Sequence, residues 1–139
     1  MRIPGRSRLG VMGTLIGLGL AAIPALAGHG AGGLVPSYYA EHVKRLIEAG
    51  EPIVLVDVRP NAAYRMAHLP GARSIPLPEL ESRLVEIPRT GRVILYGHSI
   101  IDASDAYAIL RDRGWRNVGL IEDGFAGWSR RGFPVERQR

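Results

Sequence analysis

The sequence predicts a single α/β domain in which helices cover both faces of a central parallel sheet. Short runs of β-branched and aliphatic residues alternate along the chain with segments whose apolar residues recur at helical spacing. Such alternation is typical of a three-layer fold, because a helix that connects two parallel strands must cross one face of the sheet. The length of 139 residues agrees with one domain of this kind.

Three apolar runs have the composition of strands that are buried on both faces. These expected strands cover residues 53–56, 93–96 and 118–121. A further short extended piece is expected around Ser74 and Ile75.

Helical segments are expected between and beside these strands. Ser37 is placed to cap the first, in which Tyr39, Val43, Leu46 and Ile47 recur at helical spacing, and Gly50 is placed to end it. The other expected helices run from Asn61 towards Ala67, from Pro78 to Val85, over 103–113, and from Phe125 to Arg131.

The N-terminal residues are typical of an export signal. Arg2, Arg6 and Arg8 precede a long uncharged apolar stretch, and Ala25-Leu26-Ala27 fits the small-x-small pattern of a cleavage site. We therefore expect the mature protein to be periplasmic or secreted.

Three segments follow from this interpretation. Residues 1–27 are expected to be a signal peptide, residues 28–35 a flexible linker, and residues 36–139 the folded domain. The alternative is that residues 9–27 are retained as a membrane anchor, because a stretch of that length can span a bilayer. Contact with a membrane is expected only in that case.

Charge and cysteine content exclude several function classes. Of the 18 basic residues, three lie in the N-terminal segment, so the remainder has 15 basic and 13 acidic residues. An excess of two gives no basic patch for nucleic acid. The sequence has no cysteine, which excludes a disulfide framework, a thiolate metal site and a cysteine nucleophile. The four histidines show no paired-ligand spacing, so no metal or other cofactor is expected.

The carboxyl ends of the expected strands are the natural place for a ligand site. Three loops follow these strands: Asp57 to Asn61, Gly97 to Asp102, and Glu122 to Gly124. Any binding or chemistry is expected there.

Several motifs in series resemble the rhodanese (sulfurtransferase) family. The first half carries Asp57-Val58-Arg59, Tyr64, His68-Leu69-Pro70-Gly71-Ala72 and Ile75-Pro76, and the second half carries Gly114-Trp115, Asn117-Val118, Leu120, Asp123-Gly124, Trp128, Gly132 and Pro134. The resemblance covers residues 36–136 and implies a three-layer rhodanese-like fold. Ala63 stands where the family usually has Glu, and Ala67 where it usually has Gly.

The largest departure from the family lies in the active-site loop. In rhodaneses the strand equivalent to residues 93–96 runs into a catalytic cysteine that carries sulfur as a persulfide, and an arginine often closes the loop. Counting back from Gly114-Trp115 places the cysteine position on Gly97 and the closing position on Asp102. The equivalent loop therefore reads Gly97-His98-Ser99-Ile100-Ile101-Asp102.

These replacements remove the chemistry that the resemblance implies. Gly97 supplies no nucleophile, and the Asp102 carboxylate would repel an anion such as thiosulfate. Gly97 could instead serve the backbone by accepting unusual torsion angles in a tight strand-to-helix turn. We predict no catalytic residues and a non-catalytic module that binds a small ligand or a protein partner.

Two other functions remain open at this stage. The first is sulfur handling with a cysteine supplied by a partner. The second is a weak hydrolase that uses Ser99 and His98, with Asp102 nearby, because Gly97-His98-Ser99 follows a strand as a nucleophile elbow does.

Three further polar residues are candidates for the site or its support. Asp57 and Arg59 are pocket-edge candidates, and they are also expected to stabilise the fold, with Asp57 accepting backbone N–H groups and Arg59 anchoring a loop or a helix end. His68 is expected to be a structural turn residue that donates a hydrogen bond to the backbone.

Overall fold

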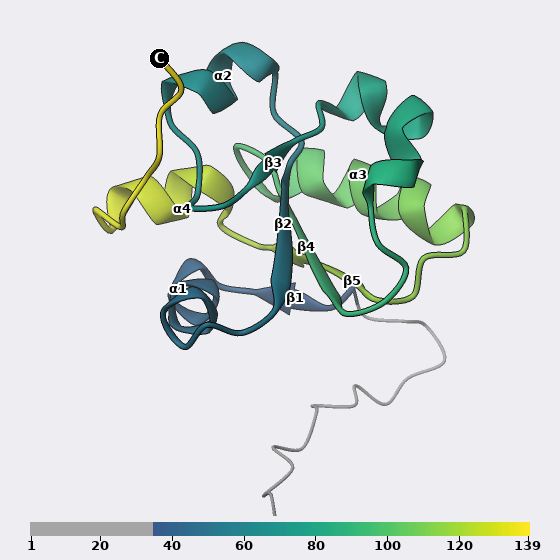
Figure 1. Cartoon of the computed structure of the whole chain (residues 1–139), viewed down its shortest axis with the longest axis horizontal. Helices are drawn as coiled ribbons and strands as arrows, with labels where there is room; N and C mark the ends of the chain where they lie inside the picture. The colour runs from purple at the N-terminus through teal and green to yellow at the C-terminus, as the bar shows by residue number, and fades with distance from the viewer. Residues whose placement is uncertain (1–34) are drawn as a thin grey trace, which may run out of the picture.

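The computed structural model describes residues 35–139, which form one α/β domain (Figure 1). The expected signal peptide over residues 1–27, the alternative anchor over 9–27 and all but the last residue of the linker over 28–35 lie outside the described residues. Within the described part of the chain, no helix has the length and apolar character needed to cross a membrane.

Five parallel strands form the sheet in the order β1-β5-β4-β2-β3. The three central strands are the expected ones: β2 (Ile53–Asp57), β4 (Arg92–Tyr96) and β5 (Val118–Ile121). The two edge strands are short, with β1 at Ser37–Tyr38 and β3 at Arg73–Ser74. Asp57 and Tyr96 are paired at the carboxyl ends of β2 and β4, which places both beside the candidate site.

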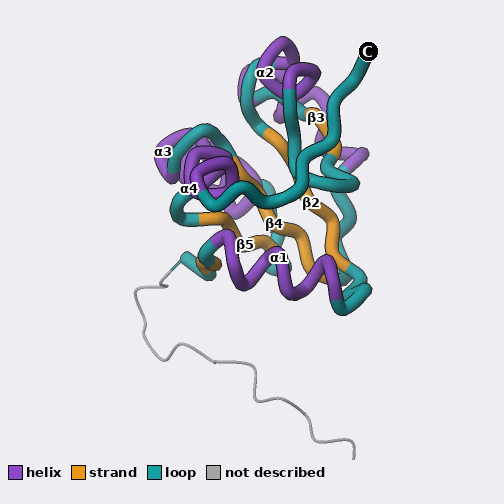
Figure 2. The backbone as a smooth tube through the Cα atoms, turned by 90° about the vertical axis from the view of Figure 1, so that its left-hand side faces the viewer, coloured by secondary structure: helices purple, strands orange, loops and turns teal. Residues whose placement is uncertain are grey.

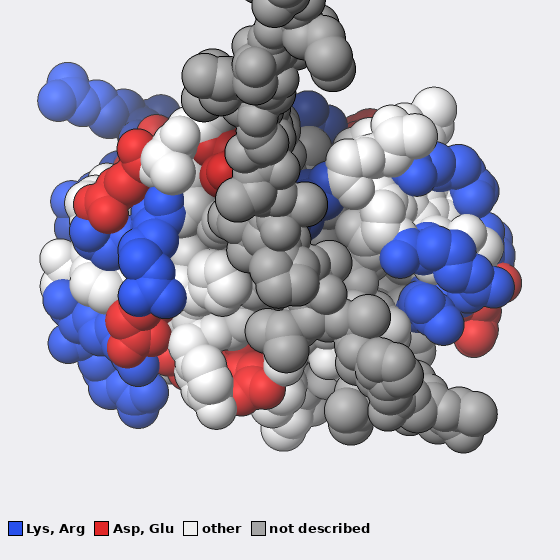
Figure 3. All heavy atoms as spheres, turned by 90° about the horizontal axis from the view of Figure 1, so that it is seen from below, with Lys and Arg blue, Asp and Glu red and all other residues white. Residues whose placement is uncertain are grey.

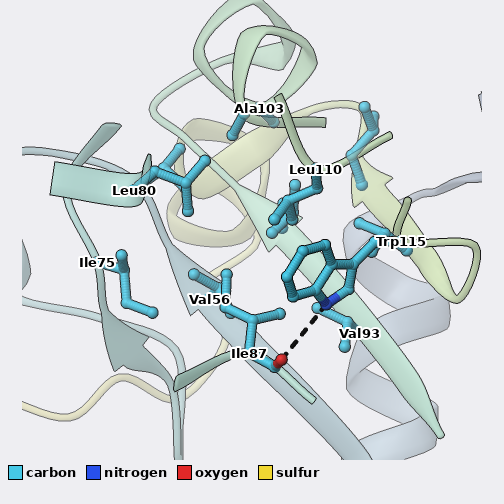
Figure 4. Packing of buried hydrophobic residues seen from close by; sticks show 13 residues of the cluster. Val56, Ile75, Leu80, Ile87, Val93, Ala103, Leu110 and Trp115 are labelled. Atoms are coloured by element: carbon cyan, nitrogen blue, oxygen red, sulfur yellow. Dashed lines mark hydrogen bonds between the residues drawn. The ribbon is translucent and has the colours of Figure 1, made fainter. Parts of the chain in front are cut away.

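One face of the sheet packs against α3 (Ile100–Asp112) and η1, a 3₁₀ helix over Leu77–Glu86. In Figure 1 these two elements lie to the right of the strands. Figure 4 shows the core between them, where the indole nitrogen of Trp115 donates to the carbonyl oxygen of Ile87 at 3.3 Å. The buried side chains of this core include Val56, Ile75, Leu80, Val93, Leu95, Ala103, Ala106, Leu110 and Val118.

The opposite face packs against α1 (Ala40–Glu48) and α4 (Gly124–Arg130), and α2 (Asn61–Met66) adds Tyr64 to the same core. Figure 2 looks towards this layer. Neighbouring residues of β4 serve opposite cores, with Ile94 on this face and Leu95 on the other, because side chains alternate along a strand. Both sides of the sheet are therefore covered, as the continuous apolar runs predict.

The start of the first helix differs from the sequence expectation. Ser37 does not cap α1; it lies in β1, and its hydroxyl donates to a Glu122 carboxylate oxygen at 2.6 Å. The helix begins after Tyr39, which gives no side-chain cap. Instead, Asp123 accepts a hydrogen bond from the Ala40 N–H at 3.1 Å. The capping carboxylate thus comes from the far end of the chain, a contact that local sequence does not reveal.

Charged side chains of both signs share the surface. On the face shown in Figure 3, blue basic and red acidic side chains lie next to one another. Arg131 contacts both Glu41 and Asp123, and Arg83 contacts Glu79 and Glu86. Exposed pairs of this kind contribute little to stability individually.

Candidate functional site

A cavity of about 640 Å³ opens at the carboxyl edge of the sheet. Its walls come from the residues that follow β2, the residues that follow β3 and the residues that follow β4. The lining residues are Val58, Arg59, Pro60, Asn61, Ala63, Pro76, Leu77, Pro78, Glu79, His98 and Asp102.

Two of the three expected loops contribute to this cavity and one does not. Residues of Asp57 to Asn61 and of Gly97 to Asp102 line it, whereas none of Glu122 to Gly124 does. The third wall is formed instead by residues 76–79, which the sequence analysis did not assign to the site. It enters because β3 pairs with the carboxyl end of β2, and Ile75-Pro76 was the sequence signal that could have pointed to it.

Asp57 and Arg59 form a buried ion pair at the end of β2. The Arg59 guanidinium donates to both carboxylate oxygens of Asp57, with distances of 2.9 Å from Nε to Oδ1 and 2.6 Å from Nη2 to Oδ2. The backbone N–H of Arg59 also donates to Oδ1 at 3.0 Å. Asp57 is fully buried and Arg59 is 5% exposed, so each charge is compensated chiefly by the other.

Arg59 also connects three parts of the chain. Its Nη2 donates to the carbonyl oxygen of Ala67, just after α2, at 2.7 Å. Its guanidinium lies 3.9 Å from the ring centroid of Phe125 in α4 and 5.6 Å from that of Tyr96 in β4. Arg59 therefore lines the cavity with a charge that Asp57 already pairs through Nε and Nη2.

Gly97 is buried directly after β4 and is closely approached by Asp102. A Cβ at position 97 would lie 2.5 Å from the Cβ of Asp102 and 2.9 Å from its Oδ2. Gly97 does not have a positive φ, so unusual torsion angles are not the reason for glycine here. The explanation expected from the sequence is corrected accordingly: the position lacks room for a side chain.

The segment after Gly97 becomes helical earlier than expected. Helix α3 begins at Ile100 rather than 103, and the Ser99 hydroxyl accepts from the Ile101 N–H at 3.4 Å. A carboxylate oxygen of Asp102 accepts from the His98 N–H at 3.2 Å. Two backbone N–H groups of this segment are thus bound by the protein's own side chains.

Helix α4 fixes the other side of this segment. The Phe125 N–H donates to the carbonyl oxygen of Gly97 at 2.9 Å, and the Ala126 N–H donates to that of His98 at 3.2 Å. Gly124 has a φ of 54°, and a Cβ there would lie 2.7 Å from the His98 carbonyl oxygen. Glycine at 124 therefore allows the close approach of α4 to the candidate site.

The Ser99, His98 and Asp102 side chains do not form a hydrolytic relay. The Ser99 hydroxyl caps α3, and Asp102 accepts from the backbone of His98 rather than from its ring. Among the described residues, no group of three or more histidine, aspartate or glutamate side chains has the arrangement of a metal site.

His68 lies away from the cavity and serves the turn after α2. Its Nδ1 donates to the Tyr64 carbonyl oxygen at 2.8 Å, and its ring stacks on the Tyr64 ring with centroids 3.8 Å apart. Its backbone pairs with that of Glu136, which holds the C-terminal segment against this turn.

Tyr96, at the end of β4, has a hydroxyl group whose pKa is strongly raised. Burial raises the pKa of this hydroxyl well above its ordinary value near 10, and the negative charge of Asp57 adds to the effect. The hydroxyl oxygen accepts from the Leu69 N–H at 3.1 Å. Tyr96 is therefore a neutral group at ordinary pH, and it holds the backbone of the turn at Leu69.

Comparison with known proteins identifies relatives of this domain. The family model described as "Rhodanese-like domain" matches residues 39–131. An HTH-type transcriptional regulator of Mycobacterium tuberculosis is 43% identical over 91 residues, which cover 64% of this chain but only 39% of the regulator. A sulfurtransferase of Allochromatium vinosum is 28% identical over 96 residues, covering 69% of this chain and 90% of that protein.

Solved structures show the same likeness. The solution structure of a rhodanese-like domain from an Anabaena protein superposes with a TM-score of 0.69 at 29% identity, covering 75% of this chain and 80% of that one. A thiosulfate sulfurtransferase of Pseudomonas aeruginosa gives a TM-score of 0.68 at 28% identity, covering 76% of this chain and 21% of the enzyme.

Proposed function

Because the chain belongs to the rhodanese-like domain family, we propose that it is a non-catalytic member that binds a small ligand or a protein partner at the cavity beside Gly97. One observation carries the proposal: the position that follows β4, where the family has its nucleophile, is a glycine whose side-chain space is taken by Asp102. The sequence offers no cysteine elsewhere to replace it. A persulfide therefore has no atom on which to form.

Exposed apolar residues next to the cavity support a partner. Ile100 and Ile101 are 42% and 68% exposed at the first turn of α3. Covering this apolar surface with a partner would be favourable, because it removes the two side chains from water. The mycobacterial relative is named a transcriptional regulator, which is consistent with a binding role for this kind of domain.

Sulfur transfer provides the direct test. We expect no transfer from thiosulfate to cyanide above a no-protein control, because Gly97 cannot carry sulfur. The measurement is thiocyanate formation, with a cysteine-containing rhodanese as the positive control. Turnover that copurifies with the cysteine-free chain through successive columns would overturn the proposal.

Sulfur handling with a partner's cysteine is the first alternative. It is supported by relatives that are named sulfurtransferase and putative sulfur carrier protein. A partner's persulfide would be an anion that approaches Asp102, so electrostatic repulsion disfavours it. The hydrolase alternative has less support, because Ser99 and Asp102 are engaged with backbone N–H groups.

We further propose that the domain acts outside the cytoplasm, on the basis of the basic, apolar and small-x-small pattern of residues 1–27. Intact-mass measurement of protein from an exporting host is expected to give a chain that begins at Gly28 and is recovered in the soluble fraction. A full-length mass in the membrane fraction would instead identify residues 9–27 as an anchor.

A further inference from the structure

We propose that the cavity beside Gly97 binds a cation, namely an ammonium or guanidinium group on an apolar stem. The inference rests on the binding role proposed above and adds the class of ligand. It reverses the charge preference of the related sulfurtransferases, whose donor thiosulfate is an anion.

Among the charged side chains that line the cavity, one carboxylate has no ion-pair partner within residues 35–139. Arg59 is paired with Asp57, and Glu79 is paired with Arg83 at 2.9 Å. Asp102 makes no ion pair with any residue of 35–139; its recorded contact is the His98 N–H. One of its two oxygens accepts that N–H, so the other remains free to accept from a ligand.

The position of Asp102 makes this carboxylate effective. Its side chain fills the space that a side chain on residue 97 would need, as the 2.5 Å separation shows. A negative charge therefore stands close to where the family's thiolate stands, but on a different residue. Because Asp102 is half-buried, its attraction for a cation is screened less than that of a fully solvated carboxylate, and the His98 N–H holds the carboxylate in place.

The remaining walls suit an apolar stem. Apart from its charged and polar members, the cavity is lined by Val58, Ala63, Leu77, Pro60, Pro76 and Pro78. Proline rings have few torsional states to lose when a ligand covers them. A volume of about 640 Å³ falls within the range of roughly 300–1,000 Å³ that small-molecule sites occupy.

The first experiment compares three probes of one shape and three charges. Benzylammonium, benzyl alcohol and benzoate are titrated into the protein, and backbone amide shifts in the cavity segments are followed by NMR. We expect benzylammonium to bind at least about tenfold more tightly than benzoate, since charge-assisted hydrogen bonds to a carboxylate contribute on this scale. Equal affinities, tighter binding of benzoate, or no binding of any probe would overturn the cation inference.

The second experiment uses a matched pair of variants in α3. Asp102→Asn removes the charge but keeps an acceptor for the His98 N–H, whereas Asp105→Asn removes the same charge from an exposed position that does not line the cavity. We expect Asp102→Asn to weaken benzylammonium binding about tenfold and to leave benzyl alcohol unaffected, with Asp105→Asn like wild type. Unchanged benzylammonium binding by Asp102→Asn would overturn the inference.

Two controls separate the possible failures. The wild-type probe series does not depend on how either variant folds, and melting curves check that both variants remain folded. Benzoate binding without thiocyanate formation would refute only the charge preference, whereas thiocyanate formation would refute the non-catalytic role itself.

A fourth probe identifies the source of the cation. Nα-acetyl-lysine-N-methylamide presents the ammonium group as a protein side chain does. Tighter binding of this probe than of benzylammonium would assign the cation to a protein partner, and weaker binding would assign it to a free amine; both results support a cation site.

Discussion

Two carboxylates near the carboxyl edge of the sheet have opposite surroundings. Asp57, at the end of β2, is fully buried and is bound by both the side chain and the backbone of Arg59. Asp102, in the first turn of α3, is half-buried and accepts one backbone N–H. The difference indicates that the first carboxylate stabilises the domain, whereas the second is left available to a ligand.

The largest expected effect comes from breaking the buried pair. Arg59→Met leaves the Asp57 charge in the core without its guanidinium, which costs about 3–5 kcal/mol in comparable pairs. Urea denaturation followed by circular dichroism measures the free energy of unfolding. Arg83→Met is the matched control, because Arg83 makes its ion pairs at the surface and its loss should change stability little. Similar losses in the two variants would contradict the distinction drawn above.

The next effect concerns the crowding of Gly97 by Asp102. Gly97→Ala is expected to lower the free energy of unfolding by about 1–3 kcal/mol, the usual range for an overpacked site. The same change should cost less in an Asp102→Gly background, because the Cβ that lies 2.5 Å from the new methyl group is then absent. A double-mutant cycle by urea denaturation gives the coupling, and strictly additive losses would show that the two residues do not compete for space.

This crowding also bears on restoring the family's cysteine. Gly97→Cys would carry the same steric cost, and a second change of Asp102→Arg would not remove it, because arginine also has a Cβ. Glycine at 102 is the change that provides room for the thiol.

The smallest expected effect is a pH dependence of the free energy of unfolding, which arises from the buried Tyr96. Burial keeps the Tyr96 hydroxyl protonated in the folded state, whereas the same hydroxyl ionises near pH 10 in the unfolded chain. The unfolded state then binds fewer protons, so stability is complete below pH 10 and falls above it, by at most about 1.4 kcal/mol per pH unit for one tyrosine.

Urea denaturation between pH 8 and 11 measures this decline. Tyr96→Phe should be less stable throughout, because the Leu69 N–H loses its acceptor, but its stability should fall less steeply above pH 10. Parallel curves for the two proteins would show that Tyr96 ionises as readily in the folded state as in the unfolded one.

The central architecture could be predicted because it follows from local composition. The three apolar runs at β2, β4 and β5 have the composition of buried strands, and Gly50 follows the end of α1 as expected. Strand β1 was missed because its two residues are defined by pairing with β5 and not by their own composition. Ser37 was assigned to a cap for the same reason, since its partner Glu122 lies far along the chain.

The site could be predicted in outline but not in its steric detail. The carboxyl edge of the sheet and the loops after β2 and β4 follow from the topology rule for parallel sheets. The contribution of Pro76 to Glu79 depends on the pairing of β3 with β2, and the contact between Gly97 and Asp102 depends on where α3 begins. Neither is encoded in a short window of sequence.

The pairing of β1 with β5 has a consequence for how the domain is assembled. The first strand of the described chain finds its partner in the last, with Ser37 opposite Leu120. A nascent chain therefore exposes β1 long before β5 exists, and this edge of the sheet stays incomplete until β5 has been synthesised. High sequence separation of this kind slows folding. The domain is accordingly expected to reach its native state only after the residues of β5 are available, so a fragment that ends before Val118 should not complete the sheet.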